Sequence, residues 1–244
     1  MPSSDSRTSH GFASTQWSLV IAAGRQSSPA AKDALALLCK AYWAPLYAYV
    51  RRRGYSVADA QDLTQEFFTR LIEKNYLKSA TPDRGRFRSF LLGSMKHFLI
   101  NEWDRSNAKK RGGGAPHMSF EFADAETALI QDAFRKLTPE ELFERRWALA
   151  VIDRALARLE REFVRAGKSE LFNSLKAYLV DGSDGTSYAE MAILIGTSEG
   201  AVKVSAHRMR RRFRELLRAE IARTVATAEE IDDEVRHLID VLGS

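Results

Sequence analysis

Residues 186–218, TSYAEMAILIGTSEGAVKVSAHRMRRRFRELLR, constrain the fold of this chain more than any other stretch. Ser187 is placed to cap a short apolar helix over Tyr188–Ile195, and Gly196 can end that helix in the left-handed conformation. Ser198 is placed to cap a second helix. The pattern therefore predicts two helices joined by a tight turn, which is the layout of a DNA-reading helix-turn-helix.

The second of these helices is strongly basic. Between Lys203 and Arg218 there are seven Lys/Arg and one Glu, for a net charge of +6. A solvated helix face usually mixes charges of both signs, so this bias favours a polyanionic partner. An ordinary helical hairpin with a basic surface is the alternative interpretation.

The composition is that of a globular protein of one large or two small domains. The chain has 244 residues, 45% hydrophobic and 28% charged, with a formal net charge of +5. No run approaches the ~20 apolar residues of a membrane span. The segment MPSSDSRTSHGFASTQ lacks the apolar core of a signal peptide, so a cytoplasmic location is expected. The single cysteine, Cys39, lies in an apolar helical run and is predicted to be a buried thiol.

Helical periodicity runs through nearly the whole chain, without the sustained alternation of β-strands. Lys109–Gly114, a basic run followed by three glycines, is the clearest candidate domain boundary. The pattern thus predicts an all-α protein of two domains. The expected helices are Thr15–Ala23, Ala30–Arg53 with a kink at Pro45 and an end at Gly54, Asp59–Lys74, Phe87–Arg105, Ala123–Gly167 with a break and new cap at Thr138-Pro139, Ser169–Val180, the two helices of the helix-turn-helix (the second over Ser198–Arg212), and Thr227–Leu242.

A second basic region lies at Arg84–Arg111, where eight Lys/Arg face two acids for a net charge of +6. Trp103 adds an aromatic ring to it. Phosphate contacts and base stacking are the means by which single-stranded DNA is held, and stacking is worth ~1–3 kcal/mol per base. Burial of Trp103 in the helical core is the equal alternative.

The helix expected over Val57–Ile72 has a polar, mostly acidic face. Asp59, Asp62, Gln65 and Glu66 lie opposite an apolar face that includes Phe67. From spacing alone a solvated helix face is the first interpretation. A metal site is not expected, because no histidine is spaced to join these carboxylates.

These segments together resemble the two-domain sigma factors of bacterial RNA polymerase, most closely the extracytoplasmic-function group. The resemblance lies in DAQDLTQEFF, in FRSFLLGSMKHFLINEWDR with the basic run after it, and in YAEMAILIGTSEGAVKVSAHRMRRRFRELL. It covers about Ala30–Arg111 and Lys176–Arg218. The order and spacing of the motifs are more specific than any motif alone.

The resemblance implies roles for named positions. The acidic face would bind the clamp helices of the polymerase largest subunit, and the flap is the other polymerase contact implied. The −10 promoter element would be captured and melted by Arg86, Arg88, Lys96, His97, Asn101, Trp103, Arg105, Lys109, Lys110 and Arg111. At His97 and Asn101 the sequence departs from the family pattern of Asn and Asp, so a −10 preference is not carried over.

The −35 element would be bound by the second helix of the helix-turn-helix. Its N-terminal residues would lie nearest the bases, while the later arginines would contact phosphates and fix the register. The residues implied are Ser198, Glu199, Gly200, Lys203, Val204, His207, Arg208, Arg211 and Arg212. Ala206 and Met209 are expected to pack rather than to contact DNA.

The expected domain layout places a partly disordered lead-in at 1–29, sigma domain 2 at 30–111, a partly helical linker at 112–142, sigma domain 4 at 143–225 and an acidic helical tail at 226–244. The apolar positions of Phe143–Glu162 predict a helix that packs onto the second domain. The tail carries six acids and one arginine, a net charge of −5. It is either an ordinary solvated helix or an autoregulatory one that covers the basic second helix of the helix-turn-helix.

Three classes of function are open to such a chain. The favoured one is a transcription initiation factor with no catalytic site and no cofactor, whose partners are polymerase core, promoter DNA and, as a further candidate, an anti-sigma protein. A helix-turn-helix regulator that acts without polymerase is the alternative, but it has no need of DAQDLTQEFF. A nuclease is disfavoured because no carboxylate and histidine set has ligand spacing and no nucleophile is paired with a base.

Overall fold

The computed structural model describes residues 29–73, 86–108, 136–179, 187–225 and 227–243, and in these ranges it contains helices and no strand. The all-α prediction is confirmed. The elements are α2 (Pro29–Arg52), α3 (Val57–Glu73), α4 (Phe87–Ala108), α6 (Pro139–Arg165), α7 (Ser169–Leu175), the 3-10 turn η3 (Lys176–Leu179), α8 (Tyr188–Leu194), α9 (Glu199–Ala222) and α10 (Glu229–Gly243).

Short-range signals in the sequence set most of these boundaries. Gly54 has φ of 95° after α2, a conformation that a residue without Cβ adopts at little cost. Thr138 caps α6 through a capping box, in which the Glu141 N–H donates to Thr138 Oγ1 (3.2 Å) and the Thr138 N–H donates to Glu141 Oε2 (2.7 Å). Pro139 takes the first helical position, where its missing N–H costs nothing. The predicted cap at Thr138 is therefore confirmed.

The first hydrophobic core joins α2, α3 and α4 to three elements from the second half of the chain. Tyr42, Leu46 and Tyr49 of α2 are fully buried in a cluster that also contains aromatic residues of α3 and α4, and the Tyr42 ring meets the Phe87 ring edge-on. The first half of α6 packs along α2 and contributes Phe143, Trp147, Ala148 and Val151. The end of α9 and the apolar side of α10 complete this core.

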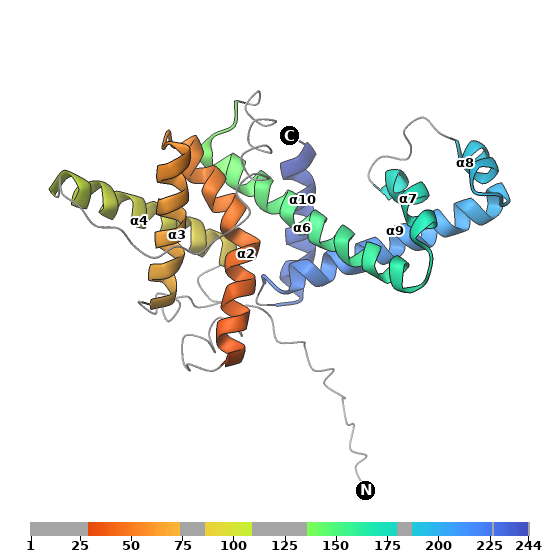
Figure 1. Cartoon of the computed structure of the whole chain (residues 1–244), viewed down its shortest axis with the longest axis horizontal. Coiled ribbons are helices and arrows are strands. Elements are labelled where there is room, and N and C mark those ends of the chain that lie inside the picture. The colour runs from red at the N-terminus through yellow and green to blue at the C-terminus, as the bar shows by residue number, and fades with distance from the viewer. Residues whose placement is uncertain (1–28, 74–85, 109–135, 180–186, 226, 244) are drawn as a thin grey trace, which may run out of the picture.

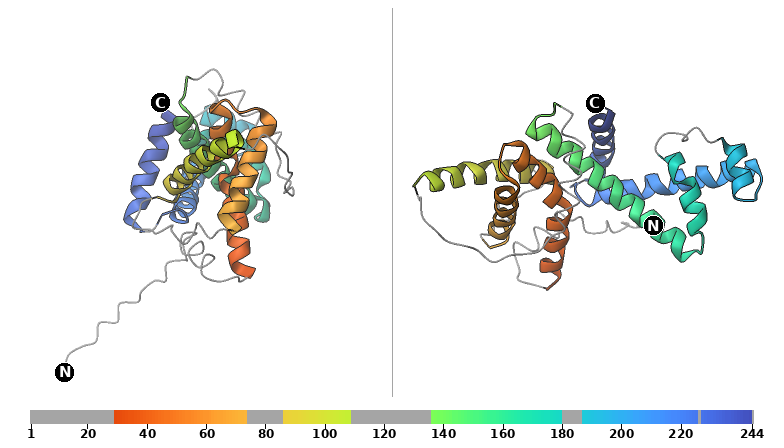
Figure 2. Two further views of the ribbon diagram at one scale, coloured as in Figure 1. Left: turned by 90° about the vertical axis from the view of Figure 1, so that its left-hand side faces the viewer. Right: turned by 45° about the horizontal axis from the view of Figure 1, so that its top comes forward.

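The second core lies at the other end of the molecule. It consists of the second half of α6 with α7, η3, α8 and the first part of α9. Leu159, Leu175 and Met209 are almost completely buried at its centre. The right-hand view of Figure 2 shows the same separation of the two regions, with α6 and α9 running between them.

Helices α6 and α9 are therefore shared by both cores. They run antiparallel, since Glu162 pairs with Arg212 (2.8 Å), and Arg154 nearer the start of α6 pairs with Glu220 nearer the end of α9 (3.5 Å). Packing of Phe143–Glu162 onto the second domain was expected throughout. This is correct for its second half and wrong for Trp147 and Val151, which lie in the first core because α6 continues straight across both.

The last two helices differ most from expectation. Helix α9 extends ten residues beyond the predicted end at Arg212, because Leu216 and Ile221 continue its buried face. Helix α10 packs on α6 and on the end of α9, not over Ser198–Arg212. Of the two alternatives for the tail, the one in which it covers the basic second helix of the helix-turn-helix is wrong, because its apolar face, which includes Val235 and Leu238, belongs to the first core.

Several expected features lie outside the described residues. They are the helix Thr15–Ala23, the basic run and glycines at Lys109–Gly114, the start of the helix predicted from Ala123, and the turn at 181–185.

Candidate polymerase and DNA interfaces

The acidic face predicted for polymerase lies on α3. Asp59 is exposed, and Ser56 caps the start of α3: the Asp59 N–H donates to Ser56 Oγ (3.1 Å) and the Ser56 hydroxyl donates to Asp59 Oδ2 (2.7 Å). Asp62 is exposed, whereas Gln65 and Glu66 are half-buried. Spacings of three and four residues place Asp59, Asp62 and Glu66 along one side of the helix. The opposite side carries Phe67, which is buried between Phe68 and Phe98.

Glu66 also belongs to a chain of ion pairs between α3 and α4. Arg70 pairs with Glu66 in the preceding turn and with Glu102 of α4, and Glu102 in turn accepts from Arg105 (2.8 Å). The guanidinium of Arg70 lies 5.2 Å from the centre of the Phe98 ring. Sequence reasoning missed Arg70 and Glu102, because a pair 32 residues apart leaves no local signal.

Three residues predicted to contact the −10 element meet at one cavity. The cavity has a volume of about 280 Å³ and lies between α3 and α4. His97, Asn101 and Arg105 follow one another at four-residue spacing on its α4 wall, and Arg70 and Leu71 line the α3 wall. Trp103 is 62% exposed on the same helix, so the alternative of burial in the core is wrong.

The remaining −10 candidates lie elsewhere on α4 or beyond it. Lys96 pairs with Glu140 of α6 (2.7 Å). Arg86 is half-buried, and Arg88 is only 4% exposed, with its guanidinium held by acids of α6 and α10. Their predicted contact with DNA therefore requires these acids to move. Lys109, Lys110 and Arg111 lie outside the described residues.

Helices α8 and α9 and the turn between them form at the positions that the sequence predicts. Ser187 and Glu190 form a capping box at α8, with the Ser187 N–H donating to Glu190 Oε2 (2.7 Å) and the Glu190 N–H donating to Ser187 Oγ (3.2 Å). These bonds to the carboxylate hold the pKa of Glu190 below its ordinary value.

The turn closes in the Schellman pattern. Gly196 has φ of 67°, its N–H donates to the Ile193 carbonyl (3.3 Å), and the Thr197 N–H donates to the Ala192 carbonyl (2.9 Å). Ser198 Oγ then accepts from the Ala201 N–H (3.3 Å) and caps α9. The predicted roles of Gly196 and Ser198 are confirmed.

The start of α9 separates into a packed side and an exposed side. Val202, Ala206 and Met209 are buried in the second core, as expected for the last two. All nine residues predicted to contact the −35 element are exposed: Ser198, Glu199, Gly200, Lys203, Val204, His207, Arg208, Arg211 and Arg212. The exposed side of this helix is therefore available to a partner along its first four turns.

Some residues of the basic stretch have structural partners. Arg212 bonds to Glu162 of α6 through Nε and Nη2 (both 2.8 Å), and hydrogen bonding from Arg212 lowers the pKa of Glu162. Arg210 donates to the Tyr178 carbonyl (2.8 Å) and to the Tyr188 hydroxyl (2.9 Å). Arg210 thus fastens α9 to η3 and α8, a role that its sequence context of consecutive arginines conceals.

The described residues hold no cluster of three or more His, Cys, Asp and Glu with the arrangement of a metal site. In that same part of the chain, no helix is long and apolar enough to cross a membrane. Among the exposed residues, Ile193 and Leu194 of α8 stand out as large apolar side chains beside the turn.

Comparison with known proteins gives one match. Residues 38–109, which run from within α2 to just beyond the end of α4, match the family model of sigma-70 region 2. No curated protein and no solved structure matches the chain significantly. Sigma-70 region 2 belongs to factors that bind RNA polymerase core and promoter DNA to initiate transcription. The match over residues 38–109 therefore supports membership of this chain in the sigma-70 family of transcription initiation factors.

Proposed function

We propose that this chain is a sigma factor of the extracytoplasmic-function type, which brings polymerase core to specific promoters. One observation carries the proposal: a sigma-70 region 2 match is followed in the same chain by a fully capped helix-turn-helix with an exposed basic helix. The first feature provides a polymerase partner and the second a duplex DNA partner. The alternative, a helix-turn-helix regulator that acts without polymerase, does not explain the sigma-70 region 2 match.

The proposed domain layout keeps the predicted boundaries, with domain 2 at 30–111, the linker at 112–142 and domain 4 at 143–225. The sharing of α6 and α9 by the two cores supports one amendment. The first half of α6 is part of the structural unit formed by domain 2 rather than a free connection.

We assign polymerase binding to Asp59, Asp62, Gln65 and Glu66. The exposed carboxylates of Asp59 and Asp62, with the half-buried Glu66 beside them, are suited to a basic surface such as that expected of the clamp helices. Phe67 is buried and anchors the helix that presents them. The flap is the second polymerase contact proposed, for the helix-turn-helix unit.

We assign the −10 element to the cavity between α3 and α4. An unstacked base in a cavity is held by hydrogen bonds to its edge and by a flanking ring. His97 and Asn101 provide hydrogen-bonding groups at the cavity, Arg105 provides a phosphate partner, and exposed Trp103 provides a stacking surface on the same helix.

We assign the −35 element to the first half of α9. Ser198, Glu199, Gly200 and Lys203 lie at the N-terminal end, which is the part of a recognition helix that contacts bases. His207, Arg208 and Arg211 lie one to three turns further along and are suited to phosphates. Arg212 is placed to contact phosphate only if it leaves Glu162.

Co-purification with bacterial polymerase core tests the proposal. Wild type is expected to bind stoichiometrically, and Asp62→Arg/Glu66→Arg is expected to lose binding because two carboxylates become cations. Because Glu66 also pairs with Arg70, Asp62→Arg alone is measured as well, with circular dichroism as a check on folding.

The charge-matched control is Glu160→Arg/Asp240→Arg, which changes two exposed acids outside α3. It is expected to bind core as wild type does. Failure of wild-type protein to bind core would favour the polymerase-independent regulator.

A further inference from the structure

Two arginines predicted to contact the −10 element form ion pairs with α10. Arg86 precedes α4 and Arg88 lies in its first turn, and both pair with the carboxylate of Glu234 on α10. Glu234 is 1% exposed and the side chain of Arg88 is 5% exposed. The contact joins residues 146 positions apart in the chain, so it is a product of the tertiary fold.

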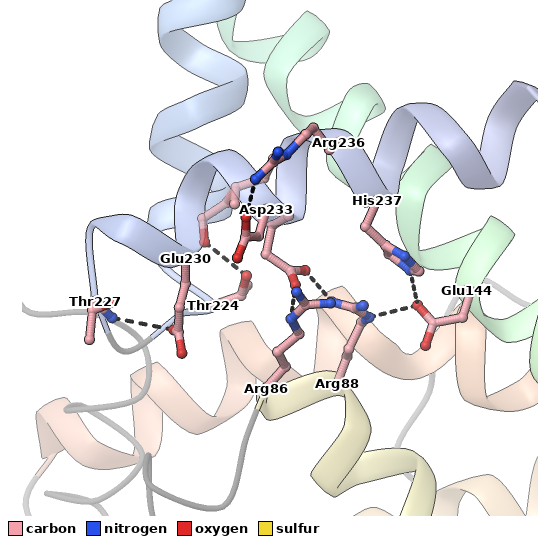
Figure 3. Close-up of polar contacts among 11 residues, drawn as sticks. Arg86, Arg88, Glu144, Thr224, Thr227, Glu230, Asp233, Arg236 and His237 are labelled. Atoms are coloured by element: carbon pink, nitrogen blue, oxygen red, sulfur yellow. Dashed lines mark hydrogen bonds and ion pairs between the residues drawn. The ribbon is translucent and has the colours of Figure 1, made fainter.

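Helix α6 contributes to the same cluster. Arg88 Nε donates to Glu144 Oε2 (2.6 Å), and His237 Nε2 of α10 lies 3.0 Å from the same oxygen. The Arg88 guanidinium also lies 4.6 Å from the centre of the Trp147 ring. Figure 3 shows Arg86 and Arg88 directed from α4 towards α10, with Glu144 between Arg88 and His237. We call Arg86, Arg88, Glu144, Glu234 and His237 the latch cluster.

In this arrangement Arg88 is enclosed, and Arg86, although half-buried, is already paired with a carboxylate. A guanidinium offers the same donor groups to a carboxylate and to a phosphate, so the two acceptors compete for it. Arginines already neutralised by protein acids displace no counterions from DNA and add nothing to the electrostatic part of its affinity.

The element that can most readily leave is α10. Its buried residues are Glu234 and Leu238, while Ile231, Val235, Val241 and Leu242 are half-buried and Ile239 is exposed. The first half of α6, by contrast, buries Phe143, Trp147 and Val151 almost completely. Because the free energy of detachment scales with apolar area exposed, α10 separates from the core at lower cost than α6.

We propose that α10 is an intramolecular latch, in which Glu234 holds Arg86 and Arg88 and lowers the DNA affinity of α4 until α10 is displaced. The proposal rests on the function proposed above, since it assigns regulation to the −10 surface. It differs from the alternative in which the tail covers the basic helix of the helix-turn-helix. Helix α10 contacts α9 only near the C-terminal end of α9, where Arg218 pairs with Asp232.

The first test compares Glu234→Gln with Asp240→Asn for binding to a fluorescent single-stranded oligonucleotide at fixed salt. Both variants remove one negative charge from α10, but Asp240 is exposed and lies outside the latch cluster. The latch predicts that Glu234→Gln raises affinity by about fivefold or more over Asp240→Asn, in the usual range of coupling between sites. Equal affinities for two folded variants would overturn the proposal.

The second test uses wild-type protein and remains decisive if Glu234→Gln does not fold. Hydrogen exchange of the α10 amides is measured in the free protein and in its complex with polymerase core and the oligonucleotide. Release predicts faster exchange in α10 on binding, with α2 and α6 still protected. Unchanged protection of α10 in a complex that does form would overturn the latch. If wild type binds no core, it is the proposed function that fails, and the exchange is then compared with and without oligonucleotide alone.

Discussion

At the scale of the residue, burial separates arginines that a sequence cannot distinguish. Arg88 and Arg105 both lie on α4 within the basic region. Arg105 is exposed and pairs with a neighbour one turn away, whereas Arg88 is buried with partners 56 and 146 residues distant. The sequence predicts the local pair at most, because the partners of Arg88 arrive on α6 and α10 only when the chain has folded.

The two arginines should differ sharply in their contribution to stability. Arg88→Ala leaves Glu234 buried with only Arg86 as a partner and is expected to lower the free energy of unfolding by about 3–5 kcal/mol. Arg105→Ala removes an exposed pair and should cost at most about 1 kcal/mol. Urea denaturation of both variants makes the comparison, and equal losses would contradict the burial of Arg88.

Cys39 gives a prediction about pH and reactivity. It is 2% exposed, and desolvation raises the pKa of its thiol to about 12. The pKa of the thiol is therefore higher in the folded than in the unfolded protein. The contribution of the buried neutral thiol to the free energy of unfolding is complete below about pH 8.5, where the unfolded thiol ionises, and is lost as pH rises towards 12.

Iodoacetamide alkylation at pH 8, followed by mass spectrometry, measures the reactivity of the Cys39 thiol. Cys39 should remain unmodified in native protein and become alkylated in urea. Modification of the native protein at the rate of the urea-unfolded chain would show that the thiol is accessible.

At the scale of the element, local chemistry sets the helix ends and long-range packing sets their lengths. The caps at Thr138, Ser187 and Ser198 and the turn at Gly196 follow from residues within four positions, so the sequence predicts them. The end of α9 could not be placed in this way. Nothing local stops a helix at Arg212, and the core contacts that extend it to Ala222 come from distant helices.

The capping box of α8 should matter for both stability and DNA binding. Ser187→Ala removes the acceptor of the Glu190 N–H and is expected to cost about 1 kcal/mol. Looser positioning of α8 against α9 should then weaken duplex DNA binding. Thermal unfolding and fluorescence anisotropy measure the two effects, with exposed Ser89→Ala as the control for stability. A Ser187→Ala variant as stable as wild type would contradict the cap.

At the scale of the whole molecule, the two domains expected from the sequence share two helices. The glycine-containing break at Lys109–Gly114 suggests independent units, but α6 and α9 cross from one core to the other. Periodicity identifies the apolar face of α6 without indicating that its two halves bury against different partners. The sequence therefore predicts the helices and the basic and acidic segments. It does not predict that α6 and α9 join the two cores into one structural unit.

Shared helices predict a single cooperative unfolding transition. Leu159→Ala leaves a cavity in the second core and should cost about 2–5 kcal/mol. Buried Trp43 and Trp147 report on the first core by fluorescence. Their midpoint should fall together with that of the helical circular dichroism signal. An unchanged tryptophan midpoint beside a lowered helical one would show two independent domains.

Transcription from genomic DNA fragments tests the central claim, initiation at specific promoters, most directly. Purified polymerase core is incubated with the fragments, with and without this protein, and the 5′ ends of the RNA are mapped. The account predicts new, discrete start sites that share −35 and −10 sequences and that disappear with Asp62→Arg/Glu66→Arg. An RNA population identical with and without the protein, from core that has bound it, would contradict the claim.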